Sequence, residues 1–198
     1  MIYTDPAHKE LHEKHGGYLE LPLLNDLKAL PKKPGVAIDI GANVGNHAVF
    51  FAREMGMSVF AFEPHPETFK ILKGNALGLQ IACINKGVDS VPGSLWITDK
   101  VNTGQNKISH QRTDMAVELT DLRECELLEV AIIKIDVEGY ELRVLQSPVV
   151  QSLIDEYKPY LAIECRDPEL ILKMLPAGYK IHAKHGGAPT YIYVHEYF

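Results

Sequence analysis

Residues 36–45 of the chain read VAIDIGANVG. The first five are mainly Val, Ile and Ala, an apolar run typical of a strand buried on both faces of a parallel sheet. A Gly-x-Asn-x-Gly turn follows, and then apolar residues recur at helical spacing. Gly41 and Gly45 allow a tight turn whose amides can approach a ligand, and the start of the helix adds further donors. The stretch therefore predicts a strand, a turn and a helix that form a cradle for a nucleotide-type ligand.

The same alternation of strand and helix continues along the chain. Apolar runs predict strands over 36–40, 58–62, 80–84, 130–135, 160–163, 180–182 and 191–195. Helical periodicity predicts helices over 46–55, 66–77, 120–125, 141–157 with a break at Pro148, and 168–175. Strands that alternate with helices form parallel sheets. We therefore expect a Rossmann-like, doubly wound α/β fold with a mostly parallel sheet.

Two segments depart from this alternation. Residues 89–115 carry turn signals on both sides of the β-prone run 95–98, which predicts an inserted hairpin and a loop able to cover a ligand. Only residues 185–189 join the last two strands, too few for a crossover helix. We therefore expect an antiparallel C-terminal hairpin at one edge of the sheet.

Length, charge and cysteine content limit the class of protein. We expect one domain over 1–198, with a helical segment at 1–35 and the α/β core at 36–198. A formal net charge of −6 gives no positive field of the kind that binds duplex nucleic acid. The three cysteines form no C-x-x-C pair, and no apolar run approaches the ~20 residues of a membrane span. The simplest expectation is a cytoplasmic protein.

Acidic residues at strand ends indicate which ligand the turn binds. Asp39 precedes the turn, where its carboxylate can accept from an ammonium group or hold the turn itself. Glu63 ends the next strand, where ribose hydroxyls are usually held. A ligand with a ribose and a positively charged amino-acid end satisfies both acids, and S-adenosylmethionine has both. The predicted cofactor residues are Asp39, Gly41, Asn43, Gly45 and Glu63, with Asp89 added because it follows the third strand, where adenine contacts often lie.

Two other functions stay open on these residues. A strand, a glycine turn, a helix and an acid at the next strand also describe an NAD-dependent oxidoreductase. Its fingerprint G-x-G-x-x-G, however, needs glycines where this chain has Asn43 and Asn46, which disfavours close approach of a pyrophosphate. The third possibility is a non-catalytic module that binds S-adenosylmethionine.

The stretch IKIDVEGYE at 133–141 resembles the FkbM family of methyltransferases, whose hallmark is a strand that runs into Asp-x-Glu-Gly-x-Glu. The resemblance covers residues 36–166 and also includes the turn at 39–45, Phe62-Glu63-Pro64, Asn75 and the run 161–164. It implies a Rossmann-like enzyme that uses S-adenosylmethionine. It also implies O-methylation of a hydroxyl on a sugar or another small-molecule or glycan acceptor.

Carboxylates on the same rim are the catalytic candidates. Asp136 ends the fourth strand beside the expected methyl donor, and it is our first candidate for orienting or deprotonating an acceptor hydroxyl. Glu138 can share that role, since paired carboxylates raise one pKa toward that of a useful base. Glu164 ends the fifth strand and can line the acceptor pocket. Glu141 is more typical of a residue that caps the following helix.

No metal is predicted. His8, His12 and His15 share one face of the first predicted helix, but their spacing is not that of H-E-x-x-H and the required acid is missing. A solvated helical face is the simpler interpretation.

Overall fold

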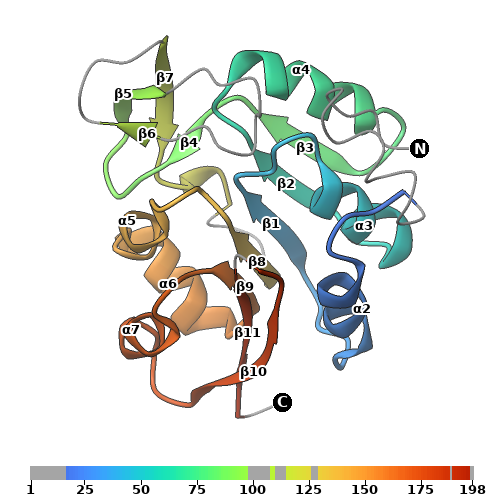
Figure 1. Cartoon of the computed structure of the whole chain (residues 1–198), viewed down its shortest axis with the longest axis vertical. Coiled ribbons are helices and arrows are strands. Elements are labelled where there is room, and N and C mark those ends of the chain that lie inside the picture. Colours follow the sequence, from blue (N-terminus) through green and yellow to red (C-terminus); the bar gives the residue numbers. More distant parts are fainter. Residues whose placement is uncertain (1–16, 98–107, 110–114, 126–128, 188, 197–198) are drawn as a thin grey trace.

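The computed structural model describes residues 17–97, 108–109, 115–125, 129–187 and 189–196. Its main sheet contains β1 (Val36–Ile40), β2 (Val59–Phe62), β3 (Ile81–Ile84), β8 (Val130–Ile135), β9 (Tyr160–Glu164), β10 (Tyr179–His185) and β11 (Thr190–His195). The strands lie in the order β10-β11-β9-β8-β1-β2-β3 (Figure 1). The five from β9 to β3 are parallel, whereas β11 pairs antiparallel with both β9 and β10. The predicted Rossmann-like fold with a C-terminal hairpin is confirmed.

Helices cover both faces of this sheet. They are α2 (Leu21–Ala29), α3 (Asn46–Glu54), α4 (Pro66–Asn75), α5 (Glu141–Leu145), α6 (Pro148–Tyr157) and α7 (Pro168–Met174). Figure 1 shows α5, α6 and α7 together on one side of the sheet and α2 and α3 on the other. The predicted break at Pro148 is confirmed, because the Ser147 hydroxyl accepts from the Val150 amide and starts α6 there.

Alternate residues of each strand pack against different helices. Ile38 and Ile40 belong to the core that contains α5, α6 and α7. Ala37 belongs to the core that contains α2 and α3. There the large Phe50 and Phe51 of α3 fill the space beside small strand residues such as Ala37. Successive side chains of a strand point to opposite faces. Asp39 therefore shares the face of Ala37 and points toward α3.

The segment between β3 and β8 differs from the prediction. It forms a second sheet with the order β4-β7-β5-β6. Its strands are β4 (Gly87–Val88), β5 (Gly93–Ile97), β6 (Ile108–Ser109) and β7 (Met115–Thr120). The predicted helix at 120–125 is wrong, because Thr120 ends β7 and only the short 3-10 turn Arg123–Cys125 follows. The side chains of β7 alternate between exposure and burial as in a half-buried strand, and the antiparallel partner β5 fixes that pattern.

Some predictions fall outside the described residues. They include the first predicted helix with His8, His12 and His15, and the loop parts 98–107 and 110–114 of the predicted insertion. Over the ranges that the structure does describe, no helix combines the length and the apolar character needed to cross a membrane.

Candidate active site

The candidate site lies where the strand order reverses. From β1 the chain proceeds through β2 to β3 on one side, and it returns later to place β8 on the other side of β1. Open α/β sheets bind their ligands beyond the carboxyl ends of the strands at such a point. The structure brings four predicted site residues to this edge: Asp39 in β1, Glu63 after β2, Asp136 after β8 and Glu164 at the end of β9.

The glycine turn packs tightly against the loop after β8. Gly41 has φ 79°, and a Cβ at this position would lie 1.9 Å from the carbonyl oxygen of Asp136. A side chain is therefore excluded at Gly41 both by the backbone conformation and by the space available. Gly45, with φ 96°, starts α3, and a Cβ there would lie 2.8 Å from Leu72. Both glycines are thus required by close contacts within the protein, with Asp136 and with Leu72.

Glu63 ties the turn to the next loop. Its carboxylate accepts from the Asn43 amide at 2.9 Å and from the His65 amide at 2.8 Å. Glu63 is buried, and this burial raises its pKa to about 7 in spite of the two hydrogen bonds. A carboxylate has about four lone-pair positions, so two remain for further donors such as hydroxyls.

Asp39 is fully buried and its partners are protein groups. One of its oxygens accepts from the Ala48 amide at 3.0 Å, in the first turn of α3, and the other lies 3.4 Å from the ammonium of Lys134. Asp39 therefore holds the start of α3, which is the structural alternative for this residue. Any contribution of Asp39 to cofactor binding would be indirect, through the shape of the glycine turn.

Lys134 is the site residue that sequence reasoning missed. It is the register partner of Asp39 across β1 and β8, so both side chains project from the same face of the sheet. Its ammonium donates to the Gly41 carbonyl at 3.0 Å and lies 3.3 Å from Asp136. Burial alone would lower the pKa of Lys134, but the carboxylates of Asp136 and Asp39 outweigh it and raise that pKa above its usual range. A lone Lys inside the apolar strand 130–135 was the available signal, since buried charges are normally paired.

Three carboxylates gather at the ends of β8 and β9. Burial, followed by the neighbouring charges of Asp136 and Glu138, raises the pKa of Glu164 to about 8. Asp136 lies beside Lys134, at 3.3 Å from its ammonium. Glu138 has φ 56°, a left-handed conformation that a non-glycine residue adopts at some energetic cost. The carboxylate pair that the sequence suggested for Asp136 and Glu138 is thus extended by Glu164 from the neighbouring strand.

The remaining two acids have structural partners. Glu141 accepts from the amides of Val137 and Gly139 at 3.2 and 2.9 Å, so it holds the loop before α5 and does not, as had been expected, cap the first turn of that helix. Asp89 follows β4 and not the third strand of the main sheet, which corrects its predicted place. Its carboxylate accepts from Tyr140 at 2.5 Å and from Arg143 at 3.0 Å, which joins the insertion to the start of α5. Burial would raise the pKa of Asp89, but these hydrogen bonds lower it.

Comparison with known proteins agrees with this geometry. Residues 39–181 match the model of the methyltransferase FkbM domain, which includes all the strand-end acids described above. The chain belongs to this family. The FkbM assignment confirms the resemblance seen in the sequence, and it supports S-adenosylmethionine as the cofactor.

One relative has a named activity. The FkbM chain is 33% identical over 119 residues to the hexuronic acid methyltransferase AglP of Haloferax volcanii. The match covers 54% of this chain and 47% of the relative, so this chain corresponds to about half of that protein.

Solved structures show the same fold. An rRNA methylase from Streptococcus thermophilus superposes with a TM-score of 0.50 at 11% identity, covering 98% of each chain. A mutant of MtNAS in complex with S-adenosylmethionine gives a TM-score of 0.50 at 14% identity, covering 98% of this chain and 68% of the other. At these identities the likeness is one of fold alone.

Proposed function

We propose that the chain is an S-adenosylmethionine-dependent methyltransferase that methylates a hydroxyl oxygen of a sugar or another small-molecule or glycan acceptor. The observation that carries the proposal is the pairing of Asp136 with Glu164 at the point where the strand order reverses, in a chain of the FkbM family. One of the two carboxyls has a pKa near neutrality and the other lies beside a lysine. A general base works best when its pKa lies near the working pH.

The cofactor residues fit this donor in their chemistry. The Gly41–Gly45 turn offers backbone amides at the start of α3, and Glu63 keeps lone pairs for ribose hydroxyls. Asp39 and Lys134 would hold the turn in shape beneath the ligand. Asp89 stays a predicted adenine contact, although Tyr140 and Arg143 already occupy its carboxylate. When bound, S-adenosylmethionine supplies a methyl group activated on a sulfonium.

The protein then has to align the acceptor and take its proton. In this proposal Asp136, which forms an ion pair with Lys134, accepts a hydrogen bond from the acceptor and orients it. Glu164 removes the hydroxyl proton while the acceptor oxygen forms its bond to the methyl carbon and the carbon–sulfur bond breaks. Glu138 lines the same acidic rim. The products are the methyl ether, a protonated Glu164 and S-adenosylhomocysteine.

The charge of the rim favours a neutral acceptor. Asp136, Glu138 and Glu164 are acidic, and the nearby Lys134 ammonium is already engaged by Asp39 and Asp136. A uronate carboxylate would be repelled there, whereas a neutral hydroxyl can donate to these oxygens. We therefore place a neutral hexose before a hexuronic acid as the first acceptor to test, although the relative AglP is named for hexuronic acid.

Two measurements test the proposal. Calorimetry should detect binding of S-adenosylmethionine, and binding of NAD in its place would overturn the assignment. A search with radiolabelled donor against fractionated glycans, lipids, small molecules and nucleic acids should then show label transfer to a hydroxylated acceptor. Binding without transfer to any fraction would favour a non-catalytic module.

The Asp136→Asn variant gives the sharpest control. It should keep donor affinity and lower methyl transfer by about 10- to 100-fold, because an amide of the same size preserves the packing but accepts a weaker hydrogen bond from the acceptor hydroxyl than a carboxylate does. Loss of donor affinity with normal turnover at saturating donor would place Asp136 in the cofactor site.

A further inference from the structure

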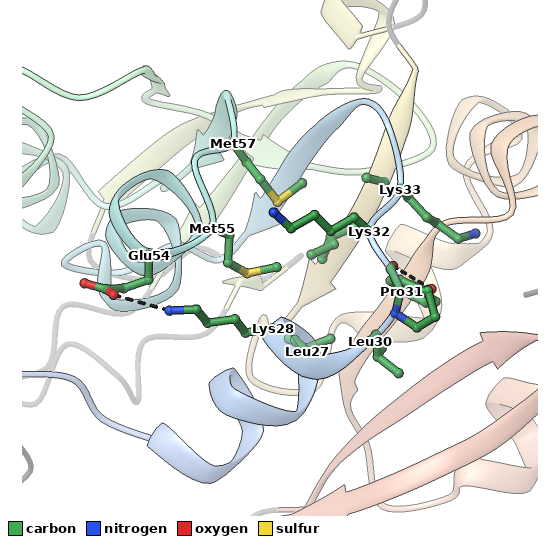
Figure 2. Close-up of a pocket in the computed structure, with 12 residues that line it drawn as sticks. Leu27, Lys28, Leu30, Pro31, Lys32, Lys33, Glu54, Met55 and Met57 are labelled. Atoms are coloured by element: carbon green, nitrogen blue, oxygen red, sulfur yellow. Dashed lines mark hydrogen bonds and ion pairs between the residues drawn. The ribbon is translucent and has the colours of Figure 1, made fainter.

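A hollow lies where the parallel strands of the main sheet begin, at the opposite end of these strands from the candidate active site. It has a volume of about 210 Å³ and is formed between the end of α2, the end of α3 and the start of β8 (Figure 2). Ala131 and Ile132, at the start of β8, line it. Asp136 lies five positions after Ala131, and a strand rises about 3.3 Å per residue, so the hollow is roughly 16 Å from the candidate active site. We call it the amino-edge pocket.

The walls of the amino-edge pocket are mainly apolar. Leu27, Met55, Met57, Ile132 and the ring of Tyr160 contribute to them. Thioether side chains are flexible and polarisable, so Met55 and Met57 can adapt to ligands of different shape, and they contact aromatic rings favourably. An apolar hollow with few polar groups is the usual form of a small-molecule site.

Three lysines line the same pocket, and two of them are engaged. Lys28 pairs with Glu54 at 3.5 Å, and Lys33 donates to the carbonyl of Lys158 and lies over the Tyr160 ring. Lys32 has no such partner within the part of the chain that the structure describes. Figure 2 shows its side chain extended toward the side of the pocket where Met55 and Met57 lie, whereas Lys33 points away.

We propose that the amino-edge pocket binds a small organic carboxylate. An aryl or alkyl body would pack against Met55 and Met57, and the carboxylate would pair with the Lys32 ammonium at the mouth of the pocket. Charge supports an anion, since three lysines and one acid, Glu54, line the pocket, and Glu54 is already paired with Lys28. The small volume excludes S-adenosylmethionine and supports a ligand of about a dozen non-hydrogen atoms.

The test uses 4-phenylbutyrate as the probe and amide NMR spectra of the full chain as the readout. We expect binding with a dissociation constant on the order of 1 mM, with shifts concentrated at residues 30–33, 55–57 and 131–132. The neutral amide 4-phenylbutyramide should bind about three- to fivefold more weakly, because an exposed ion pair contributes little. Absence of binding, or shifts spread away from these residues, would overturn the proposal.

Variants separate the charge from the cavity. Lys32→Gln should weaken 4-phenylbutyrate about three- to fivefold and leave 4-phenylbutyramide unchanged, whereas Met57→Trp should fill the hollow and abolish both. Lys180→Gln, an exposed lysine of β10 away from the pocket, is the matched control and should have no effect. Equal losses in Lys32→Gln and Lys180→Gln would mean general charge attraction. Donor binding should be unchanged in all three variants, so this test and that of the proposed function can fail independently.

Discussion

Replacing Lys134 by Met should destabilise the protein far more than loss of an ordinary surface lysine. The change removes the ammonium that lies 3.4 Å from Asp39 and 3.3 Å from Asp136, while the unbranched Met keeps most of the side-chain volume. Asp39 is fully buried and cannot recover its lost partner from water. Asp136 is partly exposed and can be solvated, so the penalty falls mainly on Asp39.

The magnitude follows from that asymmetry. Breaking a buried ion pair by removing one partner costs about 3–5 kcal/mol, because an uncompensated charge remains. A chain of this length loses about 2–4 °C in Tm for each kcal/mol, so Tm should fall by roughly 6–20 °C. The double variant Lys134→Met with Asp39→Asn should recover at least about 2 kcal/mol, because the buried group is then neutral and its oxygen can still accept from Ala48.

Urea unfolding followed by circular dichroism at pH 7.5 measures these differences. Lys70→Met is the matched control, because Lys70 forms its ion pair with Glu67 on the surface, and such pairs contribute about 0–1 kcal/mol. An unchanged unfolding midpoint in Lys134→Met, or a double variant no more stable than the single one, would refute the assignment of Lys134 as the partner that Asp39 requires.

Three further predictions concern protonation and the insertion. In the folded protein the pKa of Glu63 is about 7, above its ordinary value of 4.5, so the free energy of unfolding should fall by about 3 kcal/mol as pH rises from about 4.5 to 7. Denaturant titrations of the Glu63→Gln variant should lack this fall. Methyl transfer should rise with pH up to about 8, because Glu164 then loses its proton. The Glu164→Gln variant should lose this rise of the rate with pH and about 10²–10⁴-fold in rate. A pH profile that is unchanged in the variant would exclude Glu164 as the base. Tyr140→Phe removes a hydrogen bond to a charged group and should lower the free energy of unfolding by about 1.5 kcal/mol, and chemical denaturation with no measurable difference would mean that Arg143 alone satisfies Asp89.

Local patterns in the sequence were sufficient for the main sheet and for the cradle. Burial on both faces gives a parallel strand a continuous apolar run, and a turn with positive φ at three positions favours glycine and Asn there, so residues 36–45 could be interpreted without any neighbour. The acids that follow these strands could be placed on one rim, because the carboxyl ends of parallel strands meet at one edge. The main-sheet strands, the break at Pro148 and the C-terminal hairpin followed from the same kind of reasoning.

Contacts between distant segments decided the rest. Pairing with β5 makes a strand of residues 115–119, and after Thr120 only a short 3-10 turn follows where a helix had been predicted over 120–125. Asp39 and Lys134 are 95 positions apart, and only the register between β1 and β8 makes them partners. Glu164 acquires a pKa near 8 because the fold buries it beside Asp136. The sequence determined which chemical groups reach the rim, since that depends on where each strand ends. The tertiary structure determined their partners and charges, since register and burial arise only when separate strands pair and pack.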